Sequence, residues 1–264
     1  MSPNAHGVPA DLDDALRRLA RAARSGGTLL GLDFDGVLAP LQDDPAASRP
    51  LPEASAALHR LARVPGMHVA FVSGRALADL ADRSAPPPGT LLVGSHGAER
   101  GRWIDGRLNR ATLDLGAGEA ALLDDVAHQL LEVVHGSSGK VERKPASVVL
   151  HTRTATDDDA ARLTTAVLAI GARPGVDVLH GKDVVELSVH PVTKGDALAD
   201  LRAELGVEAV AYAGDDVTDE RAFATLGPQD VTIKVGDGPT AARFRVARPA
   251  DLADLLGRLA DLCA

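Results

Sequence analysis

The stretch LLGLDFDGVLAP at residues 29–40 joins a run of apolar residues to two acids, Asp33 and Asp35. Its apolar beginning is typical of a buried strand, and side chains two residues apart on a strand point to the same side. Two carboxylates held this close repel each other, and a bound cation would relieve the repulsion. The stretch therefore predicts a strand whose end holds a charged partner.

Strand-like and helix-like segments alternate on both sides of this stretch. Helices are expected at residues 12–25, 52–64, 75–83, 194–206, 218–227 and 249–262, and strands at 28–34, 68–74, 90–97, 209–216 and 231–236. Apolar strands that alternate with helices predict a parallel sheet covered by helices on both faces. The expected fold class is therefore α/β, with a Rossmann-like core.

Residues 108–187 follow a different pattern. Two helix-like segments are expected here at 119–136 and 156–170, and strand-like segments at 147–153, 176–180 and 183–189. This mixture predicts a smaller α+β domain inserted into the α/β core. The predicted organisation is a core at 1–107, the inserted domain at 108–187 and the rest of the core at 188–264.

The composition limits the classes of protein to consider. The chain has 264 residues, of which 45% are hydrophobic and 25% charged, as in globular proteins with one large domain or a core and a smaller companion. Aromatic residues make up 2%, so the core must consist mainly of Leu, Val and Ala. A net charge of −9 argues against a general nucleic-acid binder, which needs a basic face.

The expected location is the cytoplasm. Cys263 is the only cysteine, so the chain forms no internal disulfide, as is typical of a reducing compartment. No apolar run approaches the roughly 20 residues that span a bilayer. The first residues, MSPNAHGVPADLDDALRRLA, contain acids where a signal peptide would be basic and then apolar. No membrane partner is expected, and no pattern indicates an oligomeric state.

Polar residues follow several of the expected strands, at the edge of the sheet where parallel α/β proteins bind ligands. The clusters are Asp33 and Asp35, Ser73-Gly74-Arg75, Gly94-Ser95-His96-Gly97 and the GDDVTDE segment at 214–220. Lys194 begins a helix just before the last of these strands. Carboxylate oxygens are the ligands that Mg²⁺ prefers, and a hydroxyl, a lysine and helix amides suit a phosphate.

These segments, taken in order, resemble a known superfamily. DFDGV, VSGR, TKG and GDDVTDE resemble the four motifs of the haloacid dehalogenase-like (HAD) superfamily, and the inserted segment resembles its type-2 cap. LVGSHGAE, VERKPASVVLHTR, GKDVVELSV and YAGDDVTDERAF are similar to segments of the bacterial trehalose-6-phosphate phosphatase family. The resemblance covers residues 28–248. Val37 stands where many members of the family have Thr, although Val also occurs in the superfamily.

The resemblance implies catalytic and metal-binding roles. Asp33 would be the nucleophile, and Asp35 the general acid and base. Mg²⁺ would be held by the Asp33 carboxylate, the Asp35 backbone carbonyl and Asp215, with Asp216 and Asp219 in support.

It also implies a set of substrate-binding residues. Ser73, Gly74 and Arg75 of the VSGR motif and Lys194 of the TKG motif would bind substrate, with Ser73 and Lys194 on the phosphoryl oxygens. The residues expected to contact the disaccharide are Glu142, Lys144, Arg153 and Glu186 of the cap, with His96 and Gly97 in the loop beside them.

Structural explanations exist for some of these residues. Asp33 and Asp35 could cap a turn, and Ser73 could be an ordinary hydroxyl at a strand end. The cap residues could form a salt-bridged surface. The acids at 157–159 follow Thr156 at a helix start, where they favour the helix dipole. His151 and His190 are expected to be structural.

The function expected from the residues and the resemblance is Mg²⁺-dependent hydrolysis of trehalose 6-phosphate through an aspartyl-phosphate. The partner would be a small sugar phosphate. One alternative is a phosphatase for another phosphorylated sugar, such as a glycosyl-phosphoglycerate or sucrose 6-phosphate. A second is a sugar-phosphate sensor without catalysis, against which the intact motifs argue. A nucleotide-binding dehydrogenase is excluded because no GxGxxG follows the first strand.

Overall fold

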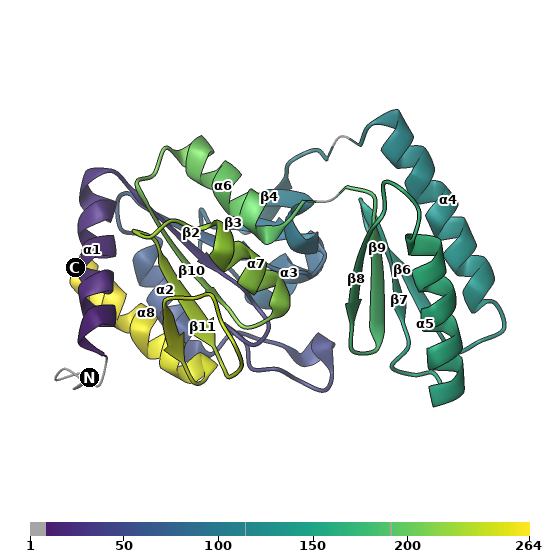
Figure 1. The fold of residues 1–264 in the computed structure, drawn as a ribbon. Coiled ribbons are helices and arrows are strands. Elements are labelled where there is room, and N and C mark those ends of the chain that lie inside the picture. The colour runs from purple at the N-terminus through teal and green to yellow at the C-terminus, as the bar shows by residue number, and fades with distance from the viewer. Residues whose placement is uncertain (1–8, 114, 191) are drawn as a thin grey trace. The chain divides into compact units, whose positions relative to one another are not determined.

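The structure is a computed structural model that describes residues 9–113, 115–190 and 192–264. Residues 1–8, which include the start of the first predicted core segment and of the acidic N-terminal stretch, lie outside the described residues. The chain forms two compact units, a larger one that ends at Ala111 and resumes at Thr193, and a smaller one from Thr112 to Val192 (Figure 1).

The division differs from the predicted domain boundaries by a few residues. Residue 108 lies inside the strand β5 (Arg107–Arg110), and residue 187 inside β9 (Val184–Ser188). β5 pairs with a strand of the larger unit and β9 pairs with a strand of the smaller unit. Because each strand belongs wholly to one sheet, the boundaries between the units lie in the connections after β5 and β9.

The larger unit alternates helices with strands, as its sequence predicted. Its elements are α1 (Ala10–Ser25), β1 (Thr28–Leu32), α2 (Pro52–Leu61), β2 (Met67–Val72), α3 (Leu77–Ser84), β3 (Leu91–Gly94), β4 (Glu99–Ile104), β5, α6 (Lys194–Leu205), β10 (Ala209–Gly214), α7 (Val217–Thr225), β11 (Val231–Val235), β12 (Phe244–Val246) and α8 (Pro249–Cys263). Short 3₁₀ turns lie at Pro45–Ala47 and Ser95–Gly97.

These strands form one sheet in the order β12-β11-β10-β1-β2-β3-β4-β5. The strands from β12 to β3 are parallel, with β1 in the middle between β10 and β2. The predicted parallel α/β sheet is therefore confirmed. Because β1 is central, Asp33, the residue after β1, lies beside the ends of β2 and β10.

Helices cover both faces of this sheet (Figure 1). One apolar core packs β1, β2 and β3 against α1, α2, α3 and α8, and a second packs the other face against α6 and α7. Leucine, valine and alanine make up most of both cores, as the low aromatic content predicted.

The hairpin of β4 and β5 extends the sheet and was not predicted from the sequence. Both strands are antiparallel to their neighbours. Asp105 and Gly106 join them with positive φ angles of 51° and 72°, and an Asp-Gly pair favours the tight turn that two-residue hairpins require. The hairpin contains four arginines, so its two strands lack the alternation of apolar and polar residues from which a strand is predicted.

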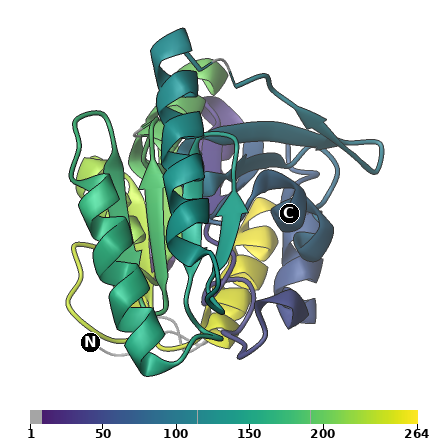
Figure 2. The same cartoon turned by 90° about the vertical axis from the view of Figure 1, so that its right-hand side faces the viewer.

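The smaller unit is an α+β fold whose sheet has the order β6-β7-β9-β8. Its elements are α4 (Ala117–Val134), β6 (Lys140–Arg143), β7 (Ser147–His151), α5 (Asp157–Gly171), β8 (Asp177–Gly181) and β9. The sheet is antiparallel, and α4 and α5 lie side by side on one of its faces (Figure 2). Thr156 caps α5 by accepting a hydrogen bond from the Asp159 N–H, as the helix-start pattern predicted.

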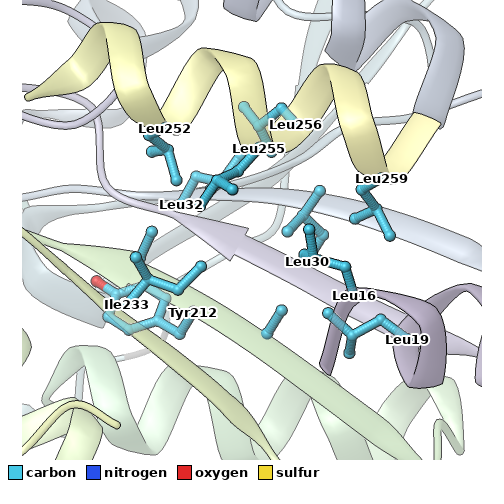
Figure 3. Close-up of a pocket in the computed structure, with 12 residues that line it drawn as sticks. Leu16, Leu19, Leu30, Leu32, Tyr212, Ile233, Leu252, Leu255, Leu256 and Leu259 are labelled. Atoms are coloured by element: carbon cyan, nitrogen blue, oxygen red, sulfur yellow. The ribbon is translucent and has the colours of Figure 1, made fainter. Parts of the chain in front are cut away.

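A pocket in the larger unit lies within the apolar core between α8, α1 and the sheet (Figure 3). Leu252, Leu255, Leu256 and Leu259 of α8 line it together with Leu30 and other apolar side chains of the sheet and α1. Such a lining offers no charged group for a sugar phosphate, so this pocket is part of the core packing. Among the helices that the structure describes, none has the length and apolar character needed to cross a membrane.

Candidate active site

Polar residues gather where β1, β2, β3 and β10 end, within the larger unit. Asp33 follows β1, Ser73 follows β2, and Ser95 follows β3. Asp215 follows β10, and Lys194 is the first residue of α6. The parallel order of the sheet brings these ends to one edge, where the sequence predicted them to meet.

Lys194 joins two of the acids directly. Its ammonium Nζ lies 2.7 Å from Asp33 Oδ2 and 2.8 Å from Asp219 Oδ1, and all three side chains are buried. The Phe34 N–H donates to the other oxygen of Asp33, Oδ1, at 2.6 Å. Asp33 is thus held by an ammonium and a backbone amide in a fixed orientation, as a nucleophile must be.

Asp215 completes a cluster of three acids. One carboxylate oxygen from each of Asp33, Asp215 and Asp219 lies within 4.8 Å of the others. Gly36 makes the approach of Asp215 possible, because a Cβ at this position would lie 2.0 Å from Asp215 Oδ2 and φ is +72°. Three carboxylates around the single ammonium of Lys194 leave two negative charges when all are ionised, and a divalent cation with hard oxygen ligands would neutralise them.

The acids of this cluster have shifted pKa values. Burial raises the pKa of Asp33 well above its ordinary value, and Asp219 and Asp215 add to the rise against the opposing charge of Lys194. Burial, followed by the charge of Asp219, raises the pKa of Asp215 to about 7. Burial opposes ionisation of Asp219 as well, but Lys194 and the Tyr212 hydroxyl hold its pKa below the ordinary value.

Asp35 lies in a different environment from Asp33. Arg75 holds the carboxylate of Asp35 with two hydrogen bonds, from Nε at 2.6 Å and from Nη2 at 2.8 Å. The repulsion between Asp33 and Asp35 that the sequence suggested is therefore not the main repulsion that acts on Asp33. The acids that raise the pKa of Asp33 are Asp215 and Asp219, which are distant in sequence.

Arg75 was predicted to contact substrate, but the structure shows its donors bound to protein groups. Besides Asp35, the guanidinium donates to Asp79 Oδ2 at 2.6 Å, to the Pro45 carbonyl at 2.8 Å and to Ser48 Oγ at 3.1 Å. It also lies 5.4 Å from the centre of the Phe34 ring. In this arrangement Arg75 fixes Asp35 and the loop that contains Pro45 and Ser48.

Ser73 and the SHG turn lie next to each other. Ser73 is buried, and its Oγ accepts a hydrogen bond from the Arg75 N–H at 3.2 Å. The ring of His96 packs over Gly74, since a Cβ there would lie 2.4 Å from His96 Cε1. Ser95 and His96 have positive φ angles of 48° and 56°, and the buried Gly97 has a φ of 130°.

Glu99 stabilises this unusual turn. Its buried Oε2 accepts hydrogen bonds from Ser95 Oγ at 2.7 Å and from the Leu77 N–H at 3.1 Å. One carboxylate thus joins the turn to the start of α3. No role was predicted for Glu99 from the sequence, although an acid at the start of a strand directly after a glycine-rich turn is a signal for such a contact.

The two supporting acids have distinct positions. Asp216 is exposed and caps α7, accepting a hydrogen bond from the Val217 N–H at 2.6 Å. Asp219 is fully buried at the centre of the cluster. Gly214 allows this, because a Cβ there would lie 2.2 Å from the Asp219 Cγ. Of the two, only Asp219 contacts Lys194 among the interactions of the described residues.

The predicted sugar-binding residues lie in the smaller unit. Glu142, Val149 and Glu186 are cross-strand neighbours on β6, β7 and β9, so their side chains share the face that α4 and α5 do not cover. Glu186 accepts hydrogen bonds from Lys144 Nζ at 3.0 Å and from Ser147 Oγ at 2.6 Å. The sequence did not identify Ser147, whose role depends on strand pairing.

Three further residues of this unit considered in the sequence are His151, His190 and Arg153. Glu142 pairs with His151 Nε2 at 2.9 Å, and that hydrogen bond holds the pKa of Glu142 below its ordinary value. His190 pairs with Glu119 at 2.9 Å. Arg153 is exposed in the turn after β7.

Comparison with known proteins identifies the family. The family model described as trehalose-phosphatase matches residues 31–250, which comprise all of the smaller unit and most of the larger one. The chain belongs to the trehalose-phosphatase family. It is 38% identical to the trehalose-phosphate phosphatase of Mycobacterium ulcerans over an alignment of 270 positions, which covers 95% of this chain and 66% of that protein. It is 35% identical to the trehalose-phosphate phosphatase of Mycobacterium tuberculosis, with coverage of 94% and 66%.

This member of the trehalose-phosphatase family thus spans about two thirds of the length of these curated relatives. Its fold is similar to that of a trehalose-6-phosphate phosphatase related protein, with a TM-score of 0.70, 27% identity and coverage of 89% of this chain and 97% of the other. The C-terminal domain of the Candida albicans trehalose-6-phosphate phosphatase has the same fold, with a TM-score of 0.71, 21% identity and coverage of 94% and 98%. The predicted HAD-type fold is confirmed.

Proposed function

We propose that this protein is a Mg²⁺-dependent phosphatase that hydrolyses trehalose 6-phosphate to trehalose and phosphate. The observation that carries the proposal is Lys194, buried between Asp33 and Asp219 with Asp215 beside them, in a chain of the trehalose-phosphatase family. A nucleophilic carboxylate, an ammonium and a divalent-cation site together suit transfer of a phosphoryl group.

In the first step, a carboxylate oxygen of Asp33 forms a bond to phosphorus while the bond from phosphorus to the sugar oxygen breaks. Lys194, whose ammonium already contacts Asp33, offsets the negative charge of the phosphoryl oxygens. Asp35 gives its proton to the departing sugar oxygen. Arg75 holds the Asp35 carboxylate in place for that transfer.

In the second step, Asp35 takes a proton from a water molecule whose oxygen bonds to phosphorus. The bond between phosphorus and Asp33 breaks, which releases phosphate and restores the free carboxylate. The proton that Asp35 gave away in the first step is thus regained in the second, and the protein returns to its starting state.

The donor set fits Mg²⁺, which prefers hard oxygen ligands. The carboxylates of Asp33 and Asp215 and the backbone carbonyl of Asp35 would hold it. When bound, Mg²⁺ supplies positive charge that offsets the acids and the phosphoryl oxygens. Asp216 would support the site by capping α7, and it is not a member of the cluster formed by Asp33, Asp215 and Asp219.

Recognition of the sugar is assigned in this proposal to Glu142, Lys144, Arg153 and Glu186 of the smaller unit, together with His96 and Gly97. Carboxylates and lysine are strong hydrogen-bonding partners of hydroxyl groups. Glu142 and Glu186 lie in one row on the sheet face that α4 and α5 do not cover, which supports this role. A cytoplasmic location remains part of the proposal.

The test is a phosphate-release assay with trehalose 6-phosphate, sucrose 6-phosphate and glucose 6-phosphate, each with and without Mg²⁺. The expected result is release from trehalose 6-phosphate in Mg²⁺, with kcat/KM at least tenfold above those for the other two esters. Equal rates on all three would contradict the proposed substrate, and turnover in EDTA would contradict the metal. Binding of trehalose 6-phosphate without release would indicate a sensor.

A further inference from the structure

Asp219 has a full set of hydrogen-bond donors. Its Oδ1 accepts from Lys194 Nζ at 2.8 Å and from the Tyr212 hydroxyl at 2.6 Å. Its Oδ2 accepts from the backbone N–H groups of Asp215 at 2.9 Å and Asp216 at 3.0 Å. A carboxylate has about four lone-pair positions. Asp219 therefore has no position left for a metal ion and organises the groups around it instead.

Tyr212 is the least expected of these donors. It is the only tyrosine of the chain and lies on β10 with 1% of its surface exposed. Its ring packs against Phe223, with the ring centres 5.7 Å apart, and Figure 3 shows the hydroxyl as the one oxygen among the labelled side chains around the apolar core. Packing alone would be served by phenylalanine, which places no polar atom in the core.

The same oxygen, Asp219 Oδ1, accepts from both Tyr212 and Lys194. The ammonium of Lys194 in turn donates hydrogen bonds to this oxygen at 2.8 Å and to Asp33 Oδ2 at 2.7 Å. We propose that Tyr212 is a positioning residue for Lys194. The Tyr212 hydroxyl donates to the same oxygen, Asp219 Oδ1, as the Lys194 ammonium, and so keeps the ammonium in contact with Asp33. This inference rests on the proposed function, in which Asp33 is the nucleophile.

Removal of the hydroxyl would change this balance. Asp219 Oδ1 would lose one of two donors inside a buried site, where an unsatisfied charged oxygen is costly. Its attraction for the ammonium of Lys194 would then increase. Lys194 would move toward Asp219 and away from Asp33 and the phosphoryl group, so phosphoryl transfer would slow while the affinity for the sugar would not change.

The kinetic test compares Tyr212→Phe with Phe223→Leu. The first removes the hydroxyl alone, and the second disturbs the packing of the same ring without touching Asp219. We expect kcat for trehalose 6-phosphate to fall about 10- to 100-fold in Tyr212→Phe, as for a lost hydrogen bond to a charged group, with KM within twofold. Phe223→Leu should keep kcat within twofold. Equal losses of kcat in the two variants would overturn the proposal and assign Tyr212 to packing.

A spectroscopic test does not depend on turnover. Because Tyr212 is the only tyrosine, 3-fluorotyrosine added during expression labels this position alone in the untagged chain. We expect Lys194→Met to shift the ¹⁹F resonance, since the hydroxyl would become the single donor to Asp219 Oδ1. Lys234→Met is the control, because Lys234 contacts the Asp215 carbonyl and not Asp219.

The two tests separate the possible failures. A ¹⁹F resonance that is the same in the wild type and in Lys194→Met would overturn the proposal. If the wild-type chain released no phosphate from any sugar phosphate, the proposed function would fail, and the ¹⁹F comparison would still decide whether Tyr212 and Lys194 share one oxygen. Thermal unfolding of each variant shows whether it is folded.

Discussion

Asp33 and Asp35 are separated by one residue but differ in their surroundings. Asp33 is buried beside Lys194, whereas the carboxylate of Asp35 is 32% exposed and held by Arg75. The residue between them, Phe34, is fully buried, which fixes the direction of both neighbours. This difference fits the proposed division of labour, in which one acid is a nucleophile and the other transfers protons.

The roles of the two acids can be separated with p-nitrophenyl phosphate. Its leaving group departs without protonation, so Asp35→Asn should still phosphorylate Asp33 and then stall, because water attack needs the base. General acid–base catalysis contributes about 10²–10⁴-fold, so the same variant should be nearly inactive on trehalose 6-phosphate. Rapid mixing should show a burst of about one equivalent of p-nitrophenol in Asp35→Asn and no burst in Asp33→Asn. A burst only in Asp33→Asn would mean that the roles are reversed.

Asp215 illustrates how a proposed metal ligand lowers the stability of the folded state. Its pKa rises from 3.8 to about 7 on folding, so the folded state binds a proton more tightly than the unfolded state. Stability is therefore lost as the pH rises from 3.8 through about 7, by up to about 4 kcal/mol before solvent screening.

Asp215→Asn should thus raise the melting temperature in EDTA at pH 8, and much less at pH 5. In Mg²⁺ the gain should vanish, because the wild type alone is stabilised by the cation. Thermal unfolding in the two buffers measures both effects. A variant less stable than the wild type in EDTA at pH 8 would contradict the origin assigned to this pKa shift.

At the scale of single residues, the sequence predicted the acids at strand ends and the lysine at a helix start, because strand ends of a parallel sheet converge. It did not predict that Arg75 would bind Asp35 or that Tyr212 would bind Asp219. Such contacts depend on side-chain directions across the sheet. A tyrosine within AVAYAG has the same apolar pattern as any core aromatic residue.

At the scale of elements, the alternation of helix and strand was predictable because each buried strand is a continuous apolar run. The hairpin of β4 and β5 and the short β12 were missed for physical reasons. Arginines occupy both hairpin strands, and β12 (Phe244–Val246) is too short to show a period. β5 and β12 are the two edge strands of the sheet, and edge strands need little apolar surface, so their sequences carry a weak signal.

One buried acid links α1 to α8. Asp13 on α1 accepts hydrogen bonds from Arg258 Nε of α8 at 3.0 Å and from Arg17 Nε at 2.9 Å. The hydrogen bond from Arg258, opposed by burial and reinforced by Arg17, holds the pKa of Asp13 below 3.8. The stabilisation is therefore complete above the unfolded pKa and is lost as the pH falls through the folded pKa.

Asp13→Asn should lower the free energy of unfolding at pH 7 by about 1.5–3 kcal/mol, the contribution of hydrogen bonds to a charged group. Below pH 3.8 the difference between variant and wild type should shrink toward zero. Urea unfolding at pH 7 and pH 3 measures it, with Asp14→Asn, at the exposed neighbouring position, as the control. An effect that is the same at both pH values would show that the charge of Asp13 is not its cause.

At the scale of the whole molecule, the chain combines a unit that carries the candidate phosphoryl-transfer site with a unit proposed to recognise the sugar. An inserted α+β segment was predictable because two helix-like segments and several strand-like segments with tight turns interrupt the regular helix–strand alternation of the core. The sequence contains no comparable pattern that identifies the disaccharide. Its recognition depends on the placement of a few hydrogen-bonding groups, such as Glu186 with Lys144 and Ser147, which strand pairing brings together.

Two substrates can separate the work of these units. Lys144→Met and Glu186→Gln should each lower kcat/KM for trehalose 6-phosphate by about 10- to 100-fold, since a hydrogen bond to a charged group is worth about 1.5–3 kcal/mol. For p-nitrophenyl phosphate, which has no sugar hydroxyls, kcat/KM should stay within about twofold of the wild-type value.

The control is Arg143→Met, next to Lys144 on the same chain segment. Arg143 pairs with Asp124 of α4 at 2.5 Å, so this variant also loses an ion pair of the smaller unit but none of the proposed sugar contacts. It should leave both substrates unaffected. Equal losses on the two substrates in Lys144→Met and Glu186→Gln would assign the pair to folding of the smaller unit, because a sugar contact lowers the rate only when the sugar is present.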